Sequence, residues 1–354
     1  MLSELSVKNF RCFEHARLEL HPESTLLIGR NAQGKTSLIE AACVLMRLQS
    51  PRTSSKSDFI RFGEKTCVIE GVTNEHRLRF AANVATRRLA VDDAVCGHSA
   101  DYLANSGLVV WMDHSDMNLL RGGAEHRRRF LDFAGSQVFP DYLDSLRRYD
   151  RALRTRNYLL KRDAVVNWRQ ADAYARVMDA LALALTEQRR KLIAWLQPEI
   201  AAMHQTLSGG EVARADYAPS VDERGLFEML LASRAEEERT RSTAAGVHRD
   251  DVALCIEERD ASSFASEGQQ RTLALAMKLA QARVIERAKN QAPVLLIDDI
   301  FGELDKTRRR AVLANLPSGS QRLITTTHLD WADDGGACGR VFEVSGGRVE
   351  GKWC

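Results

Sequence analysis

The 354-residue chain lacks the features that define several large classes of protein. It has no run of 18 apolar residues, about the length that a membrane-spanning helix needs, and no basic-then-apolar leader at its amino terminus. Its seven cysteines form no Cys-x-x-Cys pair, so neither a zinc site nor a disulfide framework is indicated. The net charge is only +2, so any basic surface must be local. We expect a cytoplasmic protein of about two domains.

One short segment matches the phosphate-binding pattern G-x-x-x-x-G-K-T, and it consists of Gly29, Arg30, Asn31, Ala32, Gln33, Gly34, Lys35 and Thr36. The glycines allow successive backbone N–H groups to point at phosphates. Lys35 would reach the β- and γ-phosphates, and Thr36 would offer its hydroxyl to Mg²⁺. An apolar run precedes the segment and a helical pattern follows it, as a helix N-terminus that binds an anion requires. A chance Gly-rich turn is therefore the weaker interpretation.

Short strands are expected around this loop, with arginines in the turns between segments. Strands are predicted near residues 2–7, 18–20, 68–69, 78–80, 89–91, 108–112 and 252–256. Arg11 ends the turn Lys8-Asn9-Phe10-Arg11 and could touch nucleotide, although composition alone favours a solvated turn residue. The polar loop of residues 50–57 is equally consistent with a solvated surface and with a phosphate contact.

A basic segment begins near residue 117. Residues 121–169 contain twelve Lys or Arg against six Asp or Glu, a local balance of 12 − 6 = +6 in a chain whose total is +2. Four cations share one helical stripe: Arg147, Arg151, Arg154 and Lys161. Such a stripe is often a solvated face, but its concentration beside Tyr149 and Tyr158 makes contact with a nucleic-acid backbone at least as probable a role.

A second long helix is predicted after this segment, with an apolar stripe of core-packing residues from Tyr174 to Leu196, and Pro198 is expected to end it. The sequence Leu-Ser-Gly-Gly-Glu at 207–211 then has the letters of an ABC-type ATPase signature. We reject that interpretation, because residues 212–218 alternate like a strand and end at Pro219. A functional signature must begin a helix so that its N–H groups face a phosphate. Residues 225–245 are charged and expected to be helical.

The segment from Ser266 to Arg271 does begin a helical pattern. Its candidate nucleotide contacts are Ser266, Gly268, Gln269 and Gln270. A buried strand then ends in two carboxylates. Asp298 would hold Mg²⁺, together with Thr36, and Asp299 would orient or deprotonate the attacking water. Asp305 follows, and His328 ends what we expect to be the last strand, where it could sense the γ-phosphate.

This order of motifs resembles the ABC-type ATPases, and within them the RecF family of recombination mediators. The similarity rests on segments spread from Lys8 to Asp305: residues 8–11, 31–36, 61–64 (Arg-Phe-Gly-Glu), 127–132 (Arg-Arg-Arg-Phe-Leu-Asp), 248–251 (His-Arg-Asp-Asp), 268–271 and 298–299. The fold that the resemblance implies is α/β, an ABC-type ATPase head with a phosphate loop and a two-lobed mixed sheet. Residues 1–116 and 246–354 would form the head, and residues 117–245 an inserted, mainly helical arm.

The resemblance also implies a function. The protein would bind ATP and Mg²⁺, dimerise on ATP at DNA gaps or single/double-strand junctions, and help a RecR-type partner to load recombinase during DNA repair, replication-fork recovery and the SOS response. ATP would lie between two copies of the chain, with residues 29–36, 298 and 299 from one copy and residues 266–270 and 305 from the other. Hydrolysis is expected to be slow, because Asp299 stands where most ABC enzymes have Glu.

Two alternatives come from other classes of ATPase. The motor subunit of another complex, such as a membrane transporter, fits poorly, because the basic helical insert suits DNA and no Gln ends the strand at 108–112. Chromosome-maintenance or break-repair heads carry far longer coiled coils than this insert. A GTPase is disfavoured, since no Asn-Lys-x-Asp motif occurs. No role is assigned to residues 113–116, and the roles of His248 and Arg249 stay open, because Val247 replaces the Pro usual before that run.

Overall fold

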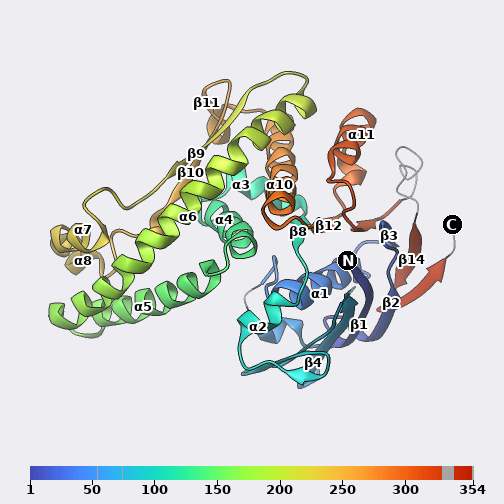
Figure 1. Ribbon diagram of the computed structural model, residues 1–354, viewed down its shortest axis with the longest axis horizontal. Coiled ribbons are helices and arrows are strands. Elements are labelled where there is room, and N and C mark those ends of the chain that lie inside the picture. The colour runs from blue at the N-terminus through green and yellow to red at the C-terminus, as the bar shows by residue number, and fades with distance from the viewer. Residues whose placement is uncertain (54, 74, 329–338, 353–354) are drawn as a thin grey trace. The chain divides into compact units, whose positions relative to one another are not determined.

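The computed structural model describes residues 1–53, 55–73, 75–328 and 339–352 (Figure 1). The chain divides into two compact units. The first consists of Met1–Asp116 and Gln281–Cys354, and the second is Met117–Ala280. The second unit begins at the residue where the sequence places the start of the arm. It extends to residue 280 rather than 245, so it contains the segment that opens at Ser266.

An antiparallel sheet forms one part of the first unit, with strand order β2-β1-β4-β5-β6-β7. Its strands are β1 (Leu2–Phe10), β2 (Phe13–Glu19), β4 (Thr66–Thr73), β5 (Arg77–Asn83), β6 (Arg87–Val91) and β7 (Ala94–Val95). Alternate residues are buried, as the apolar pattern predicts, with Leu5 and Val7 each 1% exposed. The strands predicted near residues 2–7, 18–20, 68–69, 78–80 and 89–91 all lie in this sheet, where β1 pairs with β2 and where β4, β5 and β6 form a meander.

A mostly parallel sheet carries the phosphate-binding segment, with strand order β15-β14-β3-β13-β12-β8. Its strands are β3 (Ser24–Ile28), β8 (Val109–Met112), β12 (Val294–Asp298), β13 (Arg322–Thr326), β14 (Arg340–Ser345) and β15 (Arg348–Lys352). The helices of this unit are α1 (Lys35–Arg47), α2 (Ser99–Ala104) and α11 (Lys306–Asn315). Strands β8 and β12 are almost entirely apolar and β3 is buried over most of its length, as strands covered on both faces must be.

The prediction that the strand before His328 is the last one is wrong. The chain continues into the β14–β15 hairpin, and β14 pairs in parallel with β3. Apolar residues at Val341, Phe342 and Val344 and the two glycines at 346–347 mark this hairpin in the sequence.

The second unit is built mainly of helices. They are α3 (Asn118–Arg121), α4 (Ala124–Val138), α5 (Tyr142–Arg162), α6 (Trp168–Ser208), α7 (Leu226–Ala232), α8 (Arg234–Thr240), α9 (Ala261–Phe264) and α10 (Glu267–Lys289), whose last residues belong to the first unit. The long helices α5 and α6 lie side by side (Figure 1). A small antiparallel sheet has the order β11-β10-β9, formed by β9 (Ala213–Ala218), β10 (Asp251–Ile256) and β11 (Arg259–Asp260).

Helix α6 is longer than the sequence indicates. It runs for 41 residues and contains Pro198 in its interior, so the prediction that this proline ends the helix is wrong. An interior proline removes one hydrogen bond and costs about 3 kcal/mol. Here the helix continues because Ile200, Met203 and Leu207 are buried on the same side as Leu192 and Leu196 before the proline. Tertiary burial thus outweighs the local preference of the backbone.

Candidate nucleotide-binding site

The candidate site residues of the first unit gather at one edge of the parallel sheet. Strands β3, β13, β12 and β8 are mutually parallel neighbours, so their carboxyl ends meet at the same edge. The phosphate loop follows β3, Asp298 ends β12, and His328 lies two residues beyond β13. Asp113 follows β8 at the same edge. The topology alone therefore brings together residues that are as much as 299 positions apart, from Gly29 to His328.

The loop has the backbone that its glycines predict. Gly34 adopts φ 107° immediately before α1, in the left-handed region that favours glycine. A Cβ at this position would lie 2.7 Å from the Sγ of Cys12 and from a ring carbon of Phe13. The turn that carries Arg11 therefore packs directly against the loop. A Cβ at Gly29 would collide with the carbonyl of Val344, which explains the other fixed glycine.

Lys35 lies over the loop rather than pointing into solvent. Its Nζ donates hydrogen bonds to the carbonyl oxygens of Gly29 at 2.6 Å and Arg30 at 3.0 Å. Desolvation lowers the pKa of this ammonium, while the charges of Asp299 and Asp298 raise it. A cation in this position, partly stripped of water and satisfied only by neutral acceptors, is suited to bind phosphate oxygens.

Asp298 is the centre of a hydroxyl cluster. The Thr36 hydroxyl lies 2.9 Å from each oxygen of its carboxylate, and the Thr325 hydroxyl donates to Oδ1 at 2.6 Å. Burial raises the pKa of Asp298, whereas these hydrogen bonds lower it, and the negative charge of Asp113 raises it further. Sequence reasoning identified Thr36 and Asp298 but missed Thr325 and Asp113. The position of each at the end of a strand beside β12 is the feature that could have found them.

Asp299 differs from its neighbour in its surroundings. Its backbone has φ 54°, an uncommon conformation for a non-glycine residue, and its N–H donates to the carbonyl of Thr325 at 3.2 Å. Within the described part of the chain, no group donates a hydrogen bond to its carboxylate. The carboxylate is thus available to accept a proton or a hydrogen bond from water, whereas Asp298 is already engaged.

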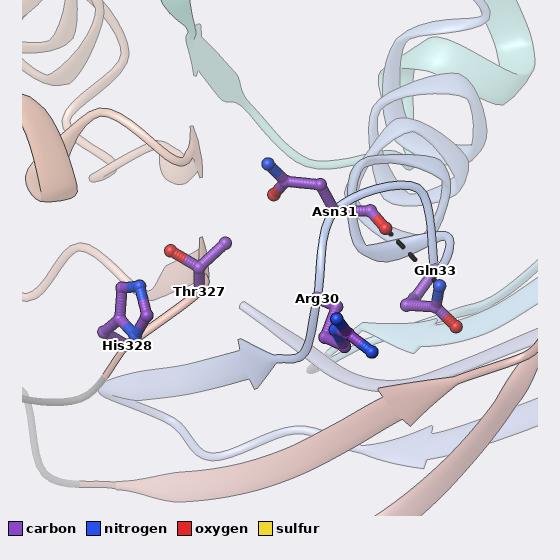
Figure 2. A pocket seen from close by; sticks show the side chains of 5 residues that line it. All are labelled: Arg30, Asn31, Gln33, Thr327 and His328. Atoms are coloured by element: carbon purple, nitrogen blue, oxygen red, sulfur yellow. Dashed lines mark hydrogen bonds between the residues drawn. The ribbon is translucent and has the colours of Figure 1, made fainter.

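A pocket of about 550 Å³ lies beside the loop and is lined by Arg30, Asn31, Gln33, Thr327 and His328. Figure 2 shows Thr327 and His328 on one side of it and the three loop residues on the other. Gln33 also accepts a hydrogen bond from the N–H of Gly346 at 2.7 Å, which ties the loop to the turn after β14. His328 is therefore placed beside the loop, and its role as a γ-phosphate sensor stays a prediction.

Arg11 is engaged by an acid that sequence reasoning missed. Its Nε and Nη2 donate to the two carboxylate oxygens of Glu40 in α1, at 2.9 and 2.6 Å. Glu40 is completely buried and also accepts hydrogen bonds from Ser50 and Arg52. Arg11 and two residues of the loop at 50–57, Ser50 and Arg52, are thus fixed to the helix that follows the phosphate loop. A direct contact of Arg11 or of the loop at 50–57 with nucleotide stays a prediction.

The predicted signature residues lie in the second unit, at the start of α10. Ser266 and Gln269 form a capping box, in which the Gln269 N–H donates to Ser266 Oγ at 3.3 Å and the Ser266 N–H donates to Gln269 Oε1 at 2.8 Å. Gln270 is buried, accepts from Arg121 Nε at 2.7 Å and donates to the carbonyls of Ala261 and Ser262. Ser266 is exposed and Gly268 partly exposed.

The remaining candidates occupy helix ends and an exposed helix face. Asp305 caps α11, where its Oδ1 accepts the Arg308 N–H at 2.8 Å. On α5, three of the four stripe residues are exposed and one is partly buried: Arg151, Arg154 and Lys161 in the first group, and Arg147 in the second. The opposite face of α5 contains the buried residues Tyr149, Ala152 and Leu159. Tyr149 therefore does not belong to the basic face, whereas Tyr158 is 61% exposed.

Two of the sequence segments without an assigned role meet in a buried network in the second unit. Arg189 donates to Asp132 at 2.7 Å and to Asp250 at 2.8 Å, and Tyr142 donates to Asp132 at 2.6 Å. Asp250, which is fully buried, also accepts hydrogen bonds from Tyr217 and from the N–H of Ser220. The residues at 127–132 and 248–251 thus join α4, α6 and β9. In this chain, both segments contribute side chains to the folded core of the second unit.

Among the residues that the structure describes, no group of three or more His, Cys, Asp or Glu side chains could hold a metal ion. A magnesium ion at a phosphate loop needs only a hydroxyl and a carboxylate from the protein, with phosphates and water completing its shell. The pair Thr36 and Asp298 has that chemistry, so the residues fit the ion. In the same described regions, no helix is long and apolar enough to span a bilayer.

The fold and the loop define the class: this is an α/β ABC-type ATPase head with a helical insert. Residues 1–349 match the model of the RecF/RecN/SMC N terminal domain. A solved SMC head, described as bound to the C-winged helix domain of ScpA, superimposes with a TM-score of 0.57 at 13% identity, covering 99% of this chain and 96% of that one. At that identity the likeness concerns the fold alone.

The chain belongs to the RecF family. It is 34% identical to the DNA replication and repair protein RecF of Synechococcus sp. (strain JA-2-3B'a(2-13)) over 369 residues, covering 98% of this chain and 97% of the relative. It is 32% identical to the protein of the same name from Geobacillus thermodenitrificans (strain NG80-2), covering 93% of each. A structure described as the recombination mediator protein RecF-ATPrS in the RecFOR pathway has a TM-score of 0.89, 26% identity and coverage of 99% and 98%. The family and fold predicted from the sequence are confirmed.

Proposed function

We propose that this protein is an ATP-dependent, DNA-binding recombination mediator. It would dimerise on ATP at DNA gaps or single/double-strand junctions and help a RecR-type partner to load recombinase. It would act in the cytoplasm, in DNA repair, replication-fork recovery and the SOS response. One observation carries the proposal. Lys35, Thr36 and Asp298 lie together at the phosphate loop, at the edge of the parallel sheet where its strands end.

The loop supplies what triphosphate binding needs. The Lys35 ammonium would exchange two neutral carbonyl acceptors for charged phosphate oxygens, which make hydrogen bonds about twice as strong. The first N–H groups of α1 have no partner within the helix and would point at the same phosphates. Thr36 and Asp298 would hold Mg²⁺, which neutralises phosphate charge when bound.

Hydrolysis would depend on Asp299. Its carboxylate has no hydrogen-bond donor among the described residues, so it can accept a proton from water, while the engaged Asp298 cannot do so without breaking its cluster. We place His328 as a contact to the γ-phosphate from the opposite side of the pocket. Aspartate is shorter than the glutamate of most ABC enzymes, which supports slow turnover and a role as a switch.

Two copies of the chain would share each nucleotide. The loop and both acids belong to the first unit, and the Ser266 cap belongs to the second. We propose that Ser266, Gly268, Gln269, Gln270 and Asp305 of one copy face the loop of the other. The Ser266 hydroxyl donates to no acceptor in the described part of the chain, so its hydrogen and the N–H groups at the start of α10 are suited to an anion.

DNA would be bound by the exposed basic face of α5. Within the described regions, Arg151, Arg154 and Lys161 form no ion pair, so their charges are available to phosphates. The acids beside this face are Asp144 and Asp163, which pair with Arg148 at 3.8 Å and Arg162 at 2.8 Å, and Asp150, which interacts electrostatically with Arg154. Tyr158 could stack on an unpaired base at a junction.

A pair of variants tests the shared site. Ser266→Arg introduces a bulky cation into the proposed joint, so this variant should bind ATP normally but fail to dimerise and to hydrolyse it. Asp299→Asn should bind ATP, lose hydrolysis by about 100-fold or more, and give a longer-lived dimer that holds gapped DNA more tightly. Ala180→Arg, which adds the same side chain at an exposed position of α6, is the control.

Light scattering with and without ATP, and sedimentation with a gapped duplex, measure these states. A Ser266→Arg protein that dimerises on ATP like the control would rule out the shared site. Loss of ATP binding itself in that variant would instead place Ser266 in the binding of its own nucleotide.

A further inference from the structure

The segment at 207–211 has the sequence of an ABC signature. It contacts the capping box that Ser266 and Gln269 form at the start of α10, in the same unit. Helix α6 ends at Ser208, Gly209 caps it with φ 82°, and β9 begins at Ala213, so the segment is a turn into a strand, as predicted. At the end of that turn, Glu211 Oε1 accepts a hydrogen bond from Gln269 Nε2 at 2.7 Å. The two residues are 58 positions apart in the chain.

This hydrogen bond determines which way the Gln269 amide faces. A carboxylate accepts hydrogen bonds and donates none, so it requires the NH₂ group of the amide to point toward Glu211. The amide oxygen must then point the other way, where it accepts the Ser266 N–H at 2.8 Å. With the amide reversed, a carboxylate would face the amide oxygen and a backbone N–H would face the NH₂ group. Glu211 thereby selects the orientation that closes the cap.

Glu211 is itself held in place from several sides. Its N–H donates to Ser208 Oγ at 3.0 Å, and its Oε2 lies 3.3 Å from Nε2 of the completely buried His204. The next residue, Val212, is bonded to Glu257 in the turn after β10. The Val212 N–H donates to Glu257 Oε1 at 2.7 Å, and the Val212 carbonyl accepts the Glu257 N–H at 2.9 Å. These contacts hold the Glu211 carboxylate in one position relative to α10.

We propose that Glu211 is a positioning residue for the nucleotide site: by fixing the Gln269 amide it holds Ser266 in the geometry that meets the γ-phosphate of ATP bound to a second copy of the chain. The inference rests on the proposed function, because it needs the shared site. Glu211 does not touch the nucleotide and acts only through the cap. The segment at 207–211 is therefore not the signature itself, but its Glu211 positions the proposed signature residues at 266–270.

The test compares Glu211→Ala, which removes the acceptor, with Glu211→Gln, whose amide oxygen can still accept from Gln269. Glu258→Gln is the matched control, since Glu258 is an exposed acid of the same unit with no hydrogen bond or ion pair among the described residues. Three quantities are measured in the full-length protein: affinity for an ATP analogue, the ATP-dependent dimer dissociation constant, and hydrogen exchange of the Ser266 and Gln269 amides.

We expect Glu211→Ala to bind the ATP analogue with unchanged affinity, because the phosphate loop is intact. Its dimer should be at least about tenfold weaker, the effect of losing one hydrogen bond to a charged group, and the Ser266 amide should exchange about tenfold faster. Glu211→Gln should restore both quantities to within about threefold of the wild type, and the control should match the wild type.

Wild-type dimerisation and exchange in Glu211→Ala would overturn the inference. So would equal losses in the Ala and Gln variants accompanied by a lower melting temperature, because a merely structural acid would give that result. If the wild type does not dimerise on ATP, the proposed function fails. The exchange rates then decide alone whether Glu211 sets the cap, and unchanged rates in Glu211→Ala would refute that as well.

Discussion

Replacing Lys35 by alanine separates nucleotide binding from folding. In the structure the ammonium makes two hydrogen bonds, to the carbonyl oxygens of Gly29 and Arg30, and burial lowers its pKa. Removing it leaves the carbonyls of the partly exposed Gly29 and the exposed Arg30 without this donor, and it also removes the cost of desolvating a cation. The two effects oppose one another, so we expect the free energy of unfolding to change by less than about 1 kcal/mol.

Nucleotide binding should respond much more strongly. A hydrogen bond between charged groups contributes about 1.5–3 kcal/mol, and 1.4 kcal/mol corresponds to a factor of ten, so the affinity for ATP should fall roughly 10- to 100-fold. Equilibrium titration with a fluorescent ATP analogue measures the affinity, and thermal unfolding measures the stability. Lys65→Ala, at an exposed lysine of the same unit, is the control.

Two results would refute the reasoning. Unchanged affinity in Lys35→Ala would remove the loop from the nucleotide site, whatever its backbone. A fall in affinity that accompanies a large fall in melting temperature would show that the lysine holds the loop together, and the binding argument would then lose its support. Preserved stability with lost affinity is the combination that the geometry predicts.

Two further predictions concern the second unit. Changing the exposed Arg151, Arg154 and Lys161 together to glutamine should flatten the slope of log affinity for duplex DNA against log salt by about 3 × 0.9. A slope equal to that of the wild type would show that this face of α5 is only solvated. Burial lowers the pKa of His248 to about 4 from its ordinary value of 6.5. The unfolded chain therefore takes up a proton below pH 6.5 while the folded chain does not. The free energy of unfolding should decrease as the pH is lowered from about 6.5 to 4. His248→Gln should make this decrease smaller by up to about 1.4 kcal/mol per pH unit, as measured by urea unfolding at several pH values. The same dependence on pH in the variant and the wild type would contradict the lowered pKa of His248.

Short-range patterns carried most of the fold prediction. The phosphate loop is recognisable because its glycines, lysine and threonine act within eight consecutive residues, between a strand and a helix that the apolar pattern also reveals. The strands of the antiparallel sheet follow from alternation of apolar residues, and the helix that begins near Ser266 follows from apolar residues at helical spacing. The same local reasoning failed at Pro198, because burial of the following turns outweighs the preference of one residue.

By itself, then, the sequence determined the phosphate-loop motif, the paired aspartates after a buried strand, the helix that begins near Ser266, and the family. Only the tertiary structure decided which partner each charged side chain has. Glu40 receives Arg11 and Arg52, Arg189 joins Asp132 to Asp250, and Glu211 receives Gln269. These partners lie between 12 and 61 positions apart in the chain. Their pairing depends on how helices and strands pack, and no periodicity along the sequence encodes it.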